Sequence, residues 1–196
     1  YEFSTPITEN IILHASYTSN TYTITYRSNG GTGNMANQQL TYDLETTLTP
    51  NTYIKKGHHF IGWNKTSENG IYIDFEDKAT VKNLTAENNG TSLLYAVWNT
   101  NITTLILNPN GGTGGTTEVT TSYNSSILNT HITNPTRIGY IFNGWDTRQN
   151  GGIQIINAAG TLTPGDGTYT NAAGYWVNTS IKHKDTITLY ANWTAK

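Results

Sequence analysis

The chain has 196 residues, of which only 12% are charged, and its formal net charge at pH 7 is −2. A charge so close to neutral offers no basic face for a phosphate backbone, which argues against nucleic-acid binding. The absence of cysteine excludes disulfides, thiolate metal sites and a cysteine nucleophile. No apolar run is long enough to span a bilayer, so we expect no membrane insertion.

Three strings of the sequence return further along the chain, two of them after nearly the same interval. Gly57 to Trp63 returns as Gly139 to Trp145, an interval of 82 (139 − 57), and Asn29 to Gly33 returns 81 positions later (110 − 29). Leu94 to Trp98 returns as Leu189 to Trp193, and a weaker copy stands upstream at Leu13 to Tyr17. A fixed period of this kind is typical of tandem repeats. We predict three units: residues 1–18 as the end of a preceding repeat, a first full repeat at 19–99, and a second at 100–196.

The first unit and the start of the first full repeat are predicted to be strands. Residues 1–17 read as a connector followed by a last strand, which we expect to pack on the first full repeat or to add a strand to it. Alternation of Tyr22, Ile24 and Tyr26 with polar residues predicts a strand with one buried face. Asn29 to Gly31 tolerate positive φ and predict a turn. The partner strand is expected at Gln38 to Tyr42, with Leu40 and Tyr42 facing inward.

The middle of each full repeat is predicted to contain no long helix. The connector at 43–56 contains Pro50 and its counterpart at 124–138 contains Pro135, and proline interrupts a helix. Gly62 lies inside a predicted strand, where glycine marks a bulge or a close approach, here by an aromatic ring. A short strand is expected at 71–75, and the repeat closes with a strand at 93–98.

The second repeat follows the same order from Thr103, with Leu105 and Leu107 as its first inward pair. It is longer than the first at one place, because Trp145 and Leu189 are 44 positions apart whereas Trp63 and Leu94 are 31 apart. About 13 residues (44 − 31) are therefore inserted near residues 161–176.

The ordered motifs resemble the Listeria–Bacteroides repeat, the B-repeat of internalin-type bacterial surface proteins. The second repeat carries an Asn-Gly-Gly turn, a Pro-Thr-Arg-x-Gly-Tyr-x-Phe-x-Gly-Trp string and a final Leu-Tyr-Ala-x-Trp; the first departs from this pattern at Lys55, Lys56 and His58. The resemblance implies a mainly β, β-grasp-like fold, that is, a ubiquitin-like α+β fold with little helix. It also implies a location outside the cell, at a bacterial surface or cell wall, and a role as spacer or weak adhesive module.

No set of residues predicts catalysis, a metal site or a cofactor, so we expect the chain not to be an enzyme. His58 and His59 form the one histidine pair, but neighbouring strand residues point to opposite faces and cannot easily chelate one ion. We expect one ring to be packed and the other solvated. Asp166-Gly167 and the acidic run from Asp74 to Asp77 lack the alternating oxygen ligands of a calcium loop.

The recurring aromatic and glycine positions are predicted to be core and backbone anchors, because they return in both repeats. They are Gly57, Phe60, Gly62, Trp63, Trp98, Gly139, Phe142, Gly144, Trp145 and Trp193. Tyr169, Tyr175 and Trp176 belong to the insertion and have no counterpart in the first repeat. They are candidate ligand-binding residues; the alternative is that they fix the inserted segment by packing.

The leading hypothesis is a tandem spacer segment of a bacterial surface protein. The alternative is a glycan- or receptor-binding module that uses the insertion, and a third, an enzyme, depends on the histidine pair alone. The expected partners are neighbouring repeats of the same chain and a host or cell-surface protein or glycan.

Overall fold

The computed structural model describes residues 4, 6, 8–66, 72–180 and 182–196, and every regular element among them is a β-strand. The first repeat contains a four-stranded sheet in the order β2-β1-β6-β4 and a separate two-stranded ladder of β3 and β5. Its strands are β1 (Thr21–Arg27), β2 (Gln38–Thr41), β3 (Thr46–Thr47), β4 (His58–Asn64), β5 (Thr80–Val81) and β6 (Gly90–Thr100).

The second repeat contains a five-stranded sheet in the order β10-β9-β11-β7-β8. In both sheets the first and last strands of the repeat lie side by side and run parallel, while the other neighbours are antiparallel. The strands are β7 (Ile102–Asn108), β8 (Glu118–Ser122), β9 (Tyr140–Asp146), β10 (Gln154–Asn157) and β11 (Thr186–Ala195).

The prediction of a mainly β fold is confirmed. The described residues contain no helix, so the helical part of a ubiquitin-like α+β fold is not supported. Proline and positive-φ residues occupy the connectors instead, including Asp43 and Asn124 at φ 65° and 58°. A backbone so punctuated cannot hold the continuous i to i−4 ladder that a helix needs.

Alternation along β1 places Tyr22, Ile24 and Tyr26 in the core, as predicted, and Tyr22 pairs with Leu40 across the hairpin. The turn that follows uses Asn29 and Gly30 at φ 48° and 81°, a region where glycine and asparagine are least strained. The prediction that Tyr42 faces the core is wrong: it lies one residue past β2 and is only partly buried.

Gly62 sits at the predicted bulge, where the register of β4 against β6 shifts between Phe60 and Gly62. We predicted that an aromatic ring approaches Gly62 closely, and this prediction is wrong. A Cβ added at Gly62 would lie 2.6 Å from the carbonyl oxygen of Phe75, and Gly144 is approached in the same way by the carbonyl oxygen of Ile156.

Each repeat has its own hydrophobic core, and the two cores share no residue. Trp63 and Trp145 are fully buried at equivalent positions. Phe60 lies 4.9 Å from Trp63 and 5.6 Å from Trp98, between ring centroids. The second repeat has the same arrangement of three aromatic rings, with Phe142 at 5.3 Å from Trp145 and 5.4 Å from Trp193 between ring centroids.

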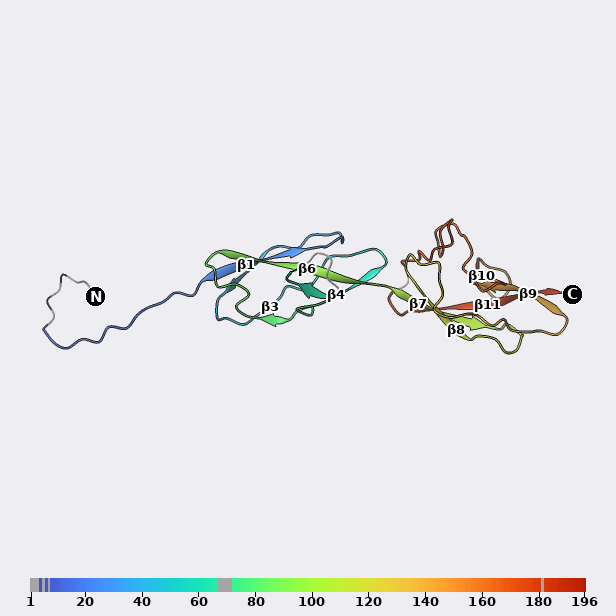
Figure 1. The fold of residues 1–196 in the computed structure, drawn as a ribbon, viewed down its shortest axis with the longest axis horizontal. Coiled ribbons are helices and arrows are strands. Elements are labelled where there is room, and N and C mark those ends of the chain that lie inside the picture. The colour runs from blue at the N-terminus through green and yellow to red at the C-terminus, as the bar shows by residue number, and fades with distance from the viewer. Residues whose placement is uncertain (1–3, 5, 7, 67–71, 181) are drawn as a thin grey trace.

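Two predicted strands are not found. Residues 72–75 form only an isolated bridge between Phe75 and Trp63, and residue 71 lies outside the described residues. Residues 8–20 form no strand and extend away from the first sheet (Figure 1), with Tyr17 90% exposed. The expectation that residues 1–17 pack on the first repeat or pair with it is therefore wrong for 8–17. Residues 1–3, 5 and 7 lie outside the described residues.

The two repeats lie end to end along the long axis of the molecule (Figure 1). β6 ends at Thr100 and β7 begins at Ile102, so Asn101 alone separates them. The strand direction continues through this residue from one sheet into the next.

Candidate functional site: the repeat junction and the inserted segment

The end of the first repeat receives a tyrosine from the second. Gly57 precedes β4 with φ +68°, and a Cβ added there would overlap the ring of Tyr123. Gly57 is buried, and the Tyr123 ring also meets His58 edge-on at 6.1 Å between centroids. Only glycine leaves room for the ring at this position. We call the contact region of Gly57, His58, His59, Asn101, Tyr123 and His183 the junction.

Asn101, the residue that links β6 to β7, forms hydrogen bonds with both repeats. Its amide N–H donates to the carbonyl oxygen of Gly57 at 2.9 Å, and its own carbonyl oxygen accepts from the amide of Tyr123 at 2.9 Å. Its side-chain Oδ1 accepts from Nδ1 of His59 at 3.0 Å. Three hydrogen bonds therefore fix the single residue between β6 and β7.

The two histidines of the first repeat both belong to this junction. The ring of His59 stacks on His183 with centroids 3.7 Å apart and planes 19° from parallel. The expectation of one packed and one solvated ring is wrong, because both His58 and His59 are partly buried. Sequence periodicity could not show this, since each ring meets residues of the other repeat.

His183 accepts a hydrogen bond from the linking backbone at the junction. Its Nδ1 lies 3.2 Å from the amide nitrogen of Ile102, which donates to it, so Nδ1 carries no proton. Desolvation, followed by the charges of His59 and Lys184, lowers the pKa of His183 below its ordinary value of 6.5. Protonation would remove the Ile102 bond and place a cation against the His59 ring.

We expect the junction to loosen in acid. The lowered pKa of His183 means that the junction is favoured fully above pH 6.5 and weakens as pH falls from 6.5 through the folded-state pKa. An NMR titration should show the amides of Asn101 and Tyr123 shifting together with the His183 ring. His183→Asn keeps a side-chain acceptor for Ile102 and should remove this pH response. An unchanged response in that variant would contradict the assignment.

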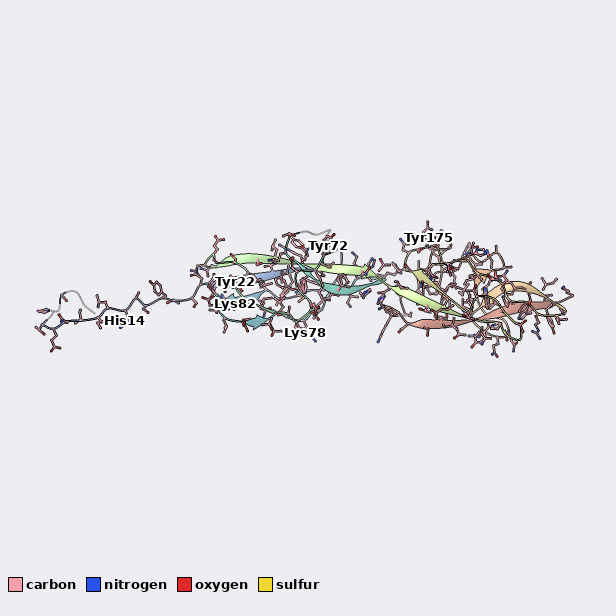
Figure 2. The ribbon with its side chains drawn as sticks, turned by 60° about the horizontal axis from the view of Figure 1, so that its bottom comes forward. His14, Tyr22, Tyr72, Lys78, Lys82 and Tyr175 are labelled. Atoms are coloured by element: carbon pink, nitrogen blue, oxygen red, sulfur yellow. The ribbon has the colours of Figure 1, made fainter. Side chains whose placement is uncertain are left out.

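The inserted segment places its three aromatic residues in different environments. Trp176 is 1% exposed and belongs to the second core, and Tyr169 packs beside it at 6.1 Å between centroids. Tyr175 is 39% exposed and lies on the outside of the second repeat (Figure 2). The burial of Trp176 favours the alternative in which aromatics fix the segment by packing, and leaves Tyr175 as the freest candidate for a ligand.

Trp176 fills space that the first repeat fills differently. The buried Tyr22 of β1 corresponds to the much smaller Thr103 of β7, which is also buried. The Trp176 indole N–H donates to Oγ1 of Thr103 at 3.1 Å. Because protein cores are densely packed, the smaller threonine of the second repeat leaves space that another large side chain has to fill. This exchange was the signal in the sequence for the packing role of the insertion.

Trp176→Ala should therefore destabilise the second repeat by about 3–5 kcal/mol, the range for truncating a buried tryptophan. Tyr175→Ala, one residue away and exposed, should change stability by less than about 0.5 kcal/mol. Urea unfolding followed by tryptophan fluorescence and circular dichroism measures both. Equal, small losses in the two variants would contradict a structural role for Trp176.

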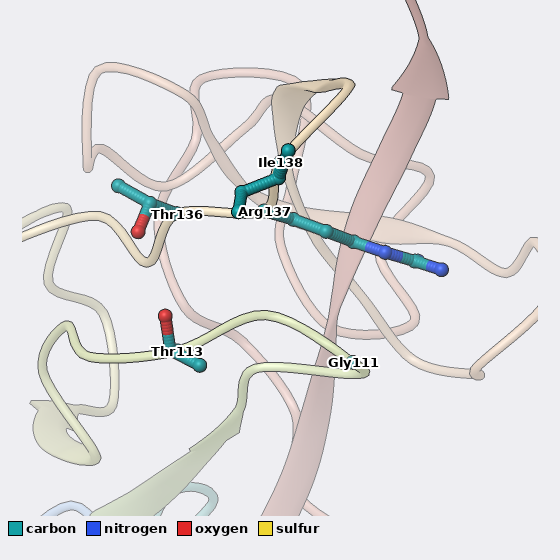
Figure 3. Close-up of a pocket in the computed structure, with 5 residues that line it drawn as sticks. All are labelled: Gly111, Thr113, Thr136, Arg137 and Ile138. Carbon is teal, nitrogen blue, oxygen red and sulfur yellow. The ribbon is translucent and has the colours of Figure 1, made fainter.

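Open cavities occur on the second repeat. One, of about 450 Å³, lies between the Gly111 turn and the segment 136–138 (Figure 3). A second, of about 340 Å³, is lined by residues that include Arg148 and Tyr169. Arg137 lines the first cavity, and its guanidinium also lies 3.9 Å from the Tyr140 ring centroid, so an aromatic face holds part of its charge.

Within the described part of the chain, no group of three or more histidine, aspartate or glutamate residues is placed to hold a metal ion. The same residues include no helix with the length and hydropathy required to cross a membrane.

The sheets, the duplicated cores and the junction define a tandem array of small β domains. The sequence model of the Listeria-Bacteroides repeat domain matches this chain twice, at residues 22–86 and 104–168. The chain belongs to this family.

Two similar proteins come from Evansella cellulosilytica. One, described as a presumed membrane protein, is 33% identical over 139 residues, which cover 71% of this chain and 19% of the relative. The other, described as a presumed Gly-rich membrane protein, is 32% identical over 140 residues, covering 70% of this chain and 14% of the relative. This chain thus spans less than a fifth of the length of either.

Proposed function

We propose that the chain is a spacer segment of a bacterial surface protein, located outside the cell at the surface or wall, and not an enzyme. The observation that carries this proposal is the junction, in which one residue links the sheets and side chains from both repeats fix the angle between them. A linker this short and this well bonded keeps two domains extended rather than folded back. The two histidine rings on which the enzyme hypothesis depends are both engaged in the junction.

Family membership supports the location, and so do the descriptions of the two relatives as membrane proteins. The expected partners are neighbouring repeats and, as weak adhesive contacts, a host or cell-surface protein or glycan. The β-grasp relationship is also a proposal, supported by the parallel central pair that the first and last strands of each repeat form.

A bead-capture experiment tests the spacer. The chain is displayed between a surface anchor and a small binding reporter, and capture of ligand-coated beads is compared with binding of the soluble ligand. We expect the double variant Gly57→Ala, Tyr123→Ala to capture fewer beads. Binding of the soluble ligand measures the number of displayed molecules and should stay unchanged. Equal bead capture by the double variant would count against a spacer that depends on the junction.

A second function, glycan or receptor binding through the insertion, is favoured by the exposed Tyr175 and by the cavity beside Tyr169. Tyr175→Ala tests it without disturbing the core, whereas replacing Trp176 would also remove packing. Loss of glycan-array or cell binding at an unchanged melting temperature would support this function. Unaltered binding would remove Tyr175 from it.

A further inference from the structure

The far end of the second repeat repeats the construction of the junction but has no tyrosine on it. Lys196 donates its amide N–H to the carbonyl oxygen of Gly139 at 2.9 Å, just as Asn101 donates to Gly57. Gly139 has φ +78°, close to the +68° of Gly57. A Cβ added at Gly139 would meet nothing within 4 Å among the described residues, whereas at Gly57 it would overlap Tyr123.

The side chains around this glycine are exposed. Ile138 is 100% exposed and Ile141, the counterpart of His59, is 52% exposed. The Tyr140 ring, the counterpart of His58, is held by Arg137 at 3.9 Å. We call the surface formed by Ile138, Gly139, Tyr140, Ile141 and Lys196 the distal face. It combines open space over a glycine with apolar side chains beside it.

The opposite end of the first repeat carries the complementary parts. Tyr42 donates its amide to the carbonyl oxygen of Asn20 at 2.7 Å, as Tyr123 does to Asn101. The Thr21 amide donates to Asn88 Oδ1 at 3.3 Å, as Ile102 does to His183 at 3.2 Å. Tyr42 therefore stands at the position from which Tyr123 reaches across the junction. We call this end, with Tyr42, Asn20, Thr21 and Asn88, the proximal face.

The spacing of the motifs fixes how the two faces would be joined. Asn101 follows Trp98 by three positions, and Lys196 follows Trp193 by three. Asn20 precedes Tyr22 by two positions, as Asn101 precedes Thr103. Asn20 and Lys196 are thus both equivalents of Asn101, and a repeat that begins with Thr21 directly after Lys196 would continue β11 as β7 continues β6.

We propose that the distal face is a docking surface for the proximal face of a further repeat of this kind, joined directly behind Lys196, with Tyr42 of that repeat lying over Gly139. The inference rests on the proposed spacer function and extends it from one junction to a regular array. Contacts between unlike faces leave one face open at each end, so the same contact can be made again without closing a ring.

The new junction would differ from the existing one in its response to acid. Ile141 stands where the first repeat has His59, and Asn88 of the added repeat would stand where the second has His183. Neither side chain titrates. The junction between the existing repeats should therefore loosen as pH falls, and the new one should not.

The test uses the whole chain followed directly by residues 21–196 of a second copy. The protein has no cysteine, so spin labels can be attached at Thr91→Cys and Thr186→Cys, which are equivalent exposed positions one repeat apart. One label pair spans the existing junction, and another pair, Thr186 and Thr91 of the appended copy, spans the new one. We expect the two distance distributions, measured by electron–electron double resonance, to be equally narrow.

Two variants make the result specific. Gly139→Ala should broaden the distribution across the new junction alone, and Gly57→Ala of the first copy should broaden that across the existing junction alone. Tyr42→Ala of the appended copy is a second way to empty the new junction, and circular dichroism confirms that each variant is folded. The proposal would be overturned if the doubled chain is folded and the distance distribution across its new junction is unchanged by both Gly139→Ala and Tyr42→Ala.

The remaining outcomes separate this inference from the spacer proposal. A narrow existing junction with a broad new one overturns the docking face and leaves the spacer standing, whereas two broad distributions overturn both. A broad new junction combined with Gly139-dependent dimerisation of the unfused chain would show that a second molecule, not a joined repeat, occupies the distal face. That result would also overturn the proposal.

Discussion

Trp145→Ala should unfold the second repeat and leave the first folded. The Trp145 ring is fully buried and contacts Phe142, and truncation of such a side chain costs about 3–5 kcal/mol. Small domains have total stabilities at the low end of about 5–15 kcal/mol, so this loss removes most of the margin. Because the cores share no residue, the first repeat should keep its own transition.

Hydrogen exchange measured by mass spectrometry checks this repeat by repeat. In the Trp145→Ala variant, the backbone amides of β9 and of its partner β11 should lose protection from exchange, while those of β1 and β6 should keep it. Trp63→Ala should give the reverse pattern. Trp145→Phe should cost less, because the indole N–H of Trp145 has no hydrogen-bond partner among the described residues and only ring volume is lost. Loss of protection throughout both repeats in Trp145→Ala would contradict separate cores.

Gly57→Ala should detach the repeats from each other, while Gly139→Ala should have a much smaller effect. Both glycines have positive φ, so alanine costs about 1–2 kcal/mol of backbone strain at either position. Only at Gly57 must the methyl group also displace the Tyr123 ring. The difference between the two variants therefore isolates the tyrosine contact from the backbone strain.

The spin-label distance between Thr91 and Thr186 in the 196-residue chain measures this difference. Gly57→Ala should broaden the distribution several-fold, and Gly139→Ala should leave it as in the unmodified chain. If both glycine variants gave the same narrow distribution, the tyrosine contact would not hold the junction.

Much of each sheet could be predicted from local pattern. The alternation of apolar and polar residues predicted the inward face of β1, and the Asn-Gly-Gly string predicted the turn that follows it. Both features depend only on residues that are neighbours in the sequence. The bulge at Gly62 followed from a glycine inside a strand, but the group that approaches it did not. That group is the Phe75 carbonyl, whose position depends on the fold of the connector rather than on any side chain.

The junction was missed because its information is split between the repeats. Comparing the two copies showed that His58 and His59 do not recur, which pointed away from a shared core role. It did not show that Tyr123 covers Gly57 or that His183 stacks on His59, since those contacts depend on how one repeat meets the next. The role of Trp176 was hidden for a related reason, because the residue it compensates, Thr103, lies 73 positions away.

The central claim is that the junction holds the two repeats as one rigid body. Residual dipolar couplings, measured by NMR on the 196-residue chain at a pH above 7, test it most directly, because they report the orientation of each sheet separately. We predict that one alignment tensor fits the amides of both sheets and that Gly57→Ala splits it into two. Two tensors of different magnitude in the unmodified chain would mean that the repeats reorient independently and would contradict the claim.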